Sequence, residues 1–131
     1  GEGQGKLIGG NLSMIYSLCG TKYDLNLDGC ILFLEDLDEY LYHIDRMMQN
    51  LKLSGKLDRL QGIIVGGMTD MHDNDTPFGM TAEEIILDVV SAYNYPVCFG
   101  FPAGHIDDNR TIILGQVASL SVSTDEIIFK Q

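Results

Sequence analysis

CILFL, residues 30–34, is the stretch that decides the predicted fold. It is a continuous apolar run of strand length, without alternating polar residues. Such a run is typical of a strand that is buried on both faces, as in a covered parallel sheet. Glu35 and Asp36 follow it directly, so we expect their carboxylates at the carboxyl end of a buried strand.

A long helix is predicted immediately after this strand. Asp36, with Glu39 three residues later, resembles a capping box in which Asp is the N-cap, and Gly55 ends the helix. Apolar residues recur between them on one helical face. These residues are Leu37, Leu41, Ile44, Met48 and Leu51.

Strands and helices continue to alternate on both sides of this unit. Asn11 is suited to cap a short helix that ends near Cys19, and Thr81 with Glu84 predicts a helix to about Tyr93. This order favours an α/β domain with parallel central strands and a β-rich end that is antiparallel or barrel-like. The other predicted strands are residues 6–8, 62–65, 97–99, 111–114, 117–122 and 126–129.

The length of 131 residues suits one compact domain. We predict that residues 6–131 form it, and that residues 1–5 (GEGQG) are a linker or a remnant of cloning. Three cysteines, an odd number, cannot all pair within the chain. Cys19, Cys30 and Cys98 are therefore predicted to be buried, reduced thiols, as in a cytosolic protein.

The charge excludes two classes of partner. Acidic residues outnumber basic ones 19 to 8, and the formal net charge is -11. Nucleic acids and anionic membranes both need a basic surface, so neither is an expected partner. No apolar stretch reaches the roughly 18 residues of a membrane span, and no signal peptide is visible.

The three histidines differ in their surroundings. His43 lies inside the long predicted helix, which favours a structural role. His72 lies in an acidic loop, residues 68–79, whose carboxylates offer hard-metal ligands. The spacing matches no metal motif, so a solvated loop is the preferred interpretation.

His105 follows a buried strand in the segment PVCFGFPAGH. Gly100, Pro102 and Gly104 predict an irregular, stiff loop just beyond the carboxyl end of that strand, where ligands of α/β folds collect. A histidine held there is well placed to act as a general base, although a loop-packing role stays open. Glu35 is expected at the same edge, where it could orient the imidazole. No G-x-S-x-G turn supplies a nucleophile.

Three segments together resemble the C-terminal domain of the LD-carboxypeptidase family, whose members include microcin C self-immunity proteins. They are residues 5–24 (GKLIGGNLSMIYSLCGTKYD), 31–67 (beginning ILFLED) and 96–105 (PVCFGFPAGH). The resemblance implies a fold similar to swivelling β/β/α domains. It also implies a Ser-Glu-His triad whose serine lies in an N-terminal domain that this chain lacks.

The resemblance also assigns residues. It implies that Glu35 and His105 are catalytic, with Asp36 and Glu39 as alternatives for the carboxylate, and that Gly100, Phe101, Pro102 and Gly104 shape a substrate cleft.

The activity implied is removal of a terminal D-amino acid from murein peptides by a cytoplasmic homodimer that needs no metal or other cofactor. The chain alone is then expected to be inactive. Two alternatives stay open: a hydrolase of microcin-like acyl nucleotides, and a non-catalytic binding or assembly module in which Glu35 and His105 make no contact.

Overall fold

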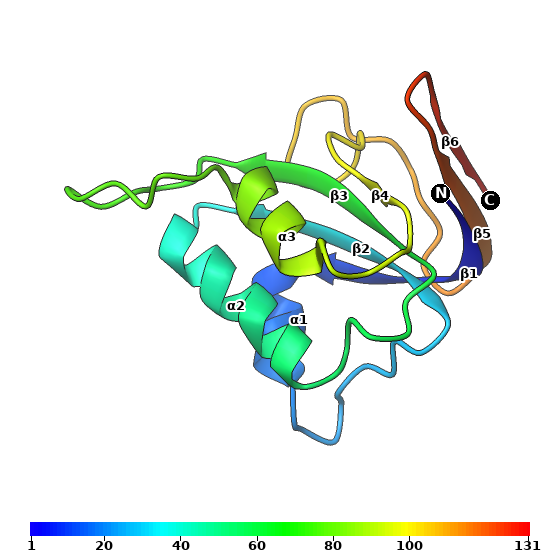
Figure 1. The fold of residues 1–131 in the computed structure, drawn as a ribbon, viewed down its shortest axis with the longest axis horizontal. Helices are drawn as coiled ribbons and strands as arrows, with labels where there is room; N and C mark the ends of the chain where they lie inside the picture. Colours follow the sequence, from blue (N-terminus) through cyan, green and yellow to red (C-terminus); the bar gives the residue numbers. More distant parts are fainter.

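A six-stranded sheet with three helices on one side forms the fold, in a computed structural model that describes residues 1–131 (Figure 1). The strand order is β4-β3-β2-β1-β5-β6. The strands are β1 (Glu2–Asn11), β2 (Cys30–Leu37), β3 (Gly62–Thr69), β4 (Val97–Cys98), β5 (Val117–Val122) and β6 (Ile127–Lys130). The helices are α1 (Leu12–Leu18), α2 (Leu41–Leu53) and α3 (Ala82–Val90).

The first four strands are parallel, and β5 and β6 close the sheet in antiparallel fashion. Each successive parallel strand is added on the same side of the previous one, with a helix in every connection. Because such crossovers are right-handed, all three helices fall on one face. The strongly curled sheet is nearly closed into a barrel, and the predicted α/β class with parallel centre and β-rich end is confirmed.

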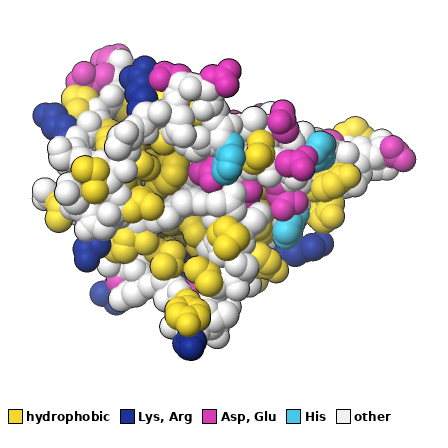
Figure 2. Space-filling view, turned by 180° about the vertical axis from the view of Figure 1, so that it is seen from behind, with side chains coloured by type: hydrophobic (Ala, Val, Ile, Leu, Met, Phe, Trp, Pro, Cys, Tyr) yellow, Lys and Arg dark blue, Asp and Glu magenta, His cyan; other side chains and the backbone are white.

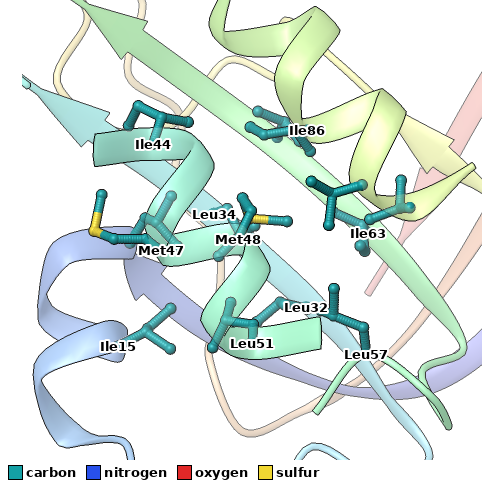
Figure 3. Packing of buried hydrophobic residues seen from close by; sticks show 14 of the residues in the cluster. Ile15, Leu32, Leu34, Ile44, Met47, Met48, Leu51, Leu57, Ile63 and Ile86 are labelled. Carbon is teal, nitrogen blue, oxygen red and sulfur yellow. The ribbon is translucent and has the colours of Figure 1, made fainter. Parts of the chain in front are cut away.

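Two apolar clusters lie on the two faces of the sheet. Leu32 and Leu34 of β2 belong to the cluster of 18 buried residues under the helices, and Figure 3 shows Met48 and Leu51 of α2 lying over this strand. Ile31 belongs to a second cluster of eight residues on the other face. The β2 strand is thus buried on both faces, as predicted from its sequence.

Three boundaries differ from the prediction. Residues 2–5 were expected to be a linker but form the start of β1. They pair there with β5, which lies more than 100 residues later in the sequence. Residues 111–114 form no strand, and the backbone N–H and carbonyl of Ile113 bond the side chain of Gln131 instead of a neighbouring strand. The β3 strand continues to Thr69, into the predicted loop.

The capping predictions had different outcomes. Asn11 accepts a hydrogen bond from the backbone of Met14, and Thr81 and Glu84 form the predicted capping box of α3. Asp36 does not cap α2, which begins later with Tyr40 at its N-cap and no side-chain cap. The cysteines are free, as predicted; Cys30 and Cys98 are buried, and Cys19 is partly exposed. No helix of the fold has the length and apolar character needed to cross a membrane.

Candidate active site

Glu35 belongs to β2 but lies where the apolar run meets the edge of the sheet. Side chains alternate between faces along a strand, so Glu35 shares the face of Ile31 and Phe33, away from the helices. The pairing with β3 shifts register between Leu34 and Asp36. This irregularity lies at Glu35, and its side chain is 7% exposed.

His105 lies on the segment that follows β4 and crosses this same face. Two backbone hydrogen bonds tie the segment to β3: Phe101 N–H donates to the Val65 carbonyl, and Gly67 N–H donates to the Ala103 carbonyl, each at 3.0 Å. A side chain at Gly66 would place its Cβ 2.3 Å from the Ala103 carbonyl oxygen. The close approach of the His105 segment therefore requires glycine at that position.

Glu35 and His105 are in direct contact. The distance from His105 Nδ1 to Glu35 Oε2 is 2.6 Å, and the backbone N–H of His105 donates to the same oxygen at 3.3 Å. The His105 side chain is 54% exposed, and its Nε2 makes no hydrogen bond within the chain. With Nδ1–H donated to the carboxylate, the neutral ring presents the Nε2 lone pair outward.

The carboxylate also changes how the imidazole titrates. The hydrogen bond and the charge of Glu35 raise the pKa of His105 above its ordinary value, and the charge of Asp36 adds to the effect. A histidine that accepts a proton readily at Nε2, and whose cation is stabilised from behind, suits general acid–base catalysis.

Gly104 makes the contact sterically possible. Its φ is +110°, a conformation that side chains disfavour, and an added Cβ would lie 2.9 Å from Cβ of Glu35. The family resemblance predicts Gly104 in a cleft wall, and in the structure Gly104 lies directly against Glu35.

Gly100, Phe101 and Pro102 line a different hollow. This apolar slot of about 430 Å³ lies between β4 and β6, and Phe101 contacts Phe129 of β6 with ring centroids 5.1 Å apart. Neither Glu35 nor His105 lines the slot. The largest hollow, about 730 Å³ along β1, β5 and β6, is also separate from them. Figure 2 shows acidic and histidine side chains gathered on one side of the face without helices, beside apolar hollows.

The other two candidate carboxylates have different partners. Asp36 points to the helical face, where it accepts hydrogen bonds from Asn11 Nδ2 and from the N–H and Oγ of Ser13, at 2.8–3.0 Å. Glu39 lies 2.9 Å from Nδ1 of His43. Of the three, only Glu35 contacts His105.

The remaining histidines also pair with acids. His43 is partly buried beside Glu39 and Tyr16, which agrees with the structural role preferred for it. His72 Nε2 bonds Asp38, and its backbone N–H donates to the Glu39 carbonyl. The fold contains no cluster of three or more histidine, cysteine or acidic side chains arranged to hold a metal ion.

The comparisons with known proteins agree with this fold. Residues 4–120 match the family model described as the LD-carboxypeptidase C-terminal domain. The chain belongs to the LD-carboxypeptidase family. It is 35% identical over 127 residues to "Probable murein peptide carboxypeptidase" of Bacillus subtilis (strain 168), covering 94% of this chain and 39% of that protein.

Two further relatives show the breadth of the LD-carboxypeptidase family. A crystal structure of muramoyltetrapeptide carboxypeptidase from Oxalobacter formigenes superposes with a TM-score of 0.87 at 30% identity, covering 98% of this chain and 45% of that one. The microcin C7 self-immunity protein MccF of Escherichia coli is 30% identical over 118 residues, covering 88% of this chain and 33% of that protein. The chain thus spans less than half the length of these relatives.

The sequence did not predict two features of this candidate site. One is the use of Gly66 and Gly104 to bring the His105 segment against β3 and Glu35. The doublet Gly66-Gly67 after a strand is a visible signal of close backbone approach, although it does not name the neighbour. The other is the contact between Asp36 and α1, which no local pattern indicates.

Proposed function

We propose that this chain is the domain of a serine-type LD-carboxypeptidase that carries Glu35 and His105, and that a serine from the remainder of a longer protein completes the triad. The observation that carries the proposal is the 2.6 Å contact of His105 Nδ1 with Glu35, which leaves Nε2 free. A non-catalytic module requires no such pair; the contact therefore favours the catalytic alternative.

The proposed roles combine the Glu35–His105 contact with the chemistry of serine triads. The oxygen of the serine hydroxyl attacks the scissile carbonyl carbon, and Nε2 of His105 takes the hydroxyl proton as the bond forms. When the C–N bond breaks, the same nitrogen protonates the leaving amine. Water then hydrolyses the acyl-enzyme with His105 again acting as base. Glu35 fixes the tautomer and stabilises the imidazolium that forms in each step.

The proposed substrate is a murein tetrapeptide, cleaved at the bond between the L-residue and the terminal D-alanine. It rests on the activities for which the Bacillus and Oxalobacter relatives are named, a murein peptide carboxypeptidase and a muramoyltetrapeptide carboxypeptidase. The relatives are more than twice as long as this chain, which supports the proposal that the remainder of a longer protein carries the nucleophile and oxyanion hole and that this chain alone is inactive. That the whole protein is a cytoplasmic homodimer is proposed from the family resemblance alone. The microcin relative supports the alternative, an acyl nucleotide substrate.

The test measures D-alanine release from a murein tetrapeptide by the longer protein that contains this domain, with the isolated chain as a second sample. An aminoacyl sulfamoyl adenosine serves as the competing substrate. Release of D-alanine by the longer protein alone supports the proposal. If only the nucleotide analogue is cleaved, the proposed substrate becomes an acyl nucleotide in place of the murein peptide. If neither compound is cleaved, the non-catalytic alternative is favoured.

A further inference from the structure

Thr69 connects the two parts of the site. It is the last residue of β3, in register with Leu37 of β2, two residues beyond Glu35. Its backbone carbonyl accepts a hydrogen bond from the N–H of Asp38 at 3.0 Å. The neighbouring end of β2 is thereby joined to Thr69.

The side chain of Thr69 bonds in the other direction. Its Oγ1 donates to the carbonyl oxygen of His105 at 2.8 Å, across 36 residues of sequence. Backbone hydrogen bonds hold the segment before His105 to β3. The hydrogen bond from the Thr69 hydroxyl is the one that holds the peptide carbonyl of His105 itself. A closed path of contacts therefore runs from Glu35 along β2, across to Thr69, and back through His105 to the Glu35 carboxylate.

We propose that Thr69 is a positioning residue that holds His105 against Glu35 with Nε2 directed outward. The inference rests on the proposed roles of Glu35 and His105. Rotation of the His105 peptide would move the ring relative to the carboxylate, and general bases act efficiently only within about 0.5 Å of their working geometry. Thr69 itself touches no reacting atom in this proposal.

The first experiment uses this chain and does not depend on hydrolysis. The ring of His105 is titrated by NMR in wild type, Thr69→Ala and Thr69→Ser. The pKa of His105 is expected to fall toward its ordinary value in Thr69→Ala, because the ring leaves Glu35, and to return in Thr69→Ser, which keeps the hydroxyl. The matched control is Thr21→Ala, which removes a hydroxyl that donates to the Leu18 carbonyl at 2.7 Å, outside the site.

The second experiment uses the longer protein. Loss of one such bond is expected to lower kcat about 3- to 10-fold with KM nearly unchanged, and Thr69→Ser to restore it. Should Thr69→Ala not fold, Thr69→Cys replaces it, since its thiol is a weaker donor than a hydroxyl. The pKa of His105 is then expected to be lower in Thr69→Cys than in Thr69→Ser.

Three outcomes separate the inference from the proposed function. A His105 titration unchanged in Thr69→Ala, or equally altered in Thr69→Ser, overturns the role of Thr69 whatever the enzyme hydrolyses. An altered titration that Thr69→Ser restores, in a protein that hydrolyses neither substrate, supports the link and removes the proposed function. Altered titration together with reduced kcat supports both.

Discussion

Glu35 and Asp36 are neighbours in β2, yet their carboxylates lie on opposite faces of the sheet and bond different partners. Glu35 meets His105, while Asp36 meets Asn11 and Ser13 at the start of α1. The period of two along a strand explains the division. One acidic pair thus serves a candidate catalytic contact on one face and joins β2 to a helix terminus on the other.

Asp36→Ala is expected to destabilise the fold. The change removes the acceptor for Asn11 Nδ2, the Ser13 N–H and the Leu37 N–H, and leaves these donors unsatisfied beside the core. The expected loss is about 2–4 kcal/mol in the free energy of unfolding, measured with urea. Asp28→Ala, which removes an exposed partner of Arg59, is the control and should cost under about 1 kcal/mol. Equal losses would contradict the proposed role of Asp36.

Glu35→Gln is expected to reduce turnover by the longer protein about 10²- to 10⁴-fold. The amide is nearly the same size but carries no charge, so it stabilises the His105 imidazolium poorly and can select the wrong tautomer. Steady-state kinetics on the murein tetrapeptide measure the effect. Glu39→Gln is a matched control, because Glu39 also contacts a histidine, His43, away from the site. A comparable loss in the control would refute the assignment.

The pKa of His105 is expected to lie above its ordinary value of 6.5 and to fall in Glu35→Gln. Since the folded state binds the His105 proton more tightly than the unfolded chain, the contact adds most stability below about pH 6.5 and loses this part as pH rises through the raised pKa. NMR titration measures the pKa directly. The stability of wild type relative to Glu35→Gln should also be greater at about pH 6 than at about pH 9; the opposite order would refute this linkage.

Gly104→Ala is expected to disturb the site more than Gly100→Ala. Both glycines have positive φ, but only at Gly104 does the added Cβ meet another group, the Glu35 side chain at 2.9 Å. The backbone strain alone costs about 1 kcal/mol at either position, and the clash adds to it at Gly104. Urea unfolding and the His105 NMR signal measure the two effects. If both variants lose the same stability and show the same His105 signal, the Glu35 side chain moves aside at no measurable free-energy cost, and the predicted clash is contradicted.

Much of this arrangement could be predicted because its causes are local. The apolar run before Glu35 predicts a buried strand, and Gly100, Pro102 and Gly104 predict a stiff loop before His105. In a parallel sheet the carboxyl ends of strands share one edge, which brings these two residues near each other. The structure adds the contact itself and its geometry.

The parts that could not be predicted depend on distant neighbours. Asp36 and Glu39 have the spacing of a capping box, but Asp36 bonds residues 23 and 25 positions earlier in the chain. Residues 2–5 are rich in glycine and read as a linker, although pairing with β5 makes them a strand. Thr69 falls at the edge of a polar loop, and nothing in the sequence links it to His105.

Turnover by the longer protein carrying His105→Ala, compared with His72→Ala, tests the central claim most directly. Both changes remove a histidine that bonds a carboxylate, but only His105 is proposed to exchange a proton with the nucleophile. The account predicts that His105→Ala lowers kcat at least about 10³-fold while His72→Ala stays within about threefold of wild type. Near-normal turnover by a folded His105→Ala variant would contradict it.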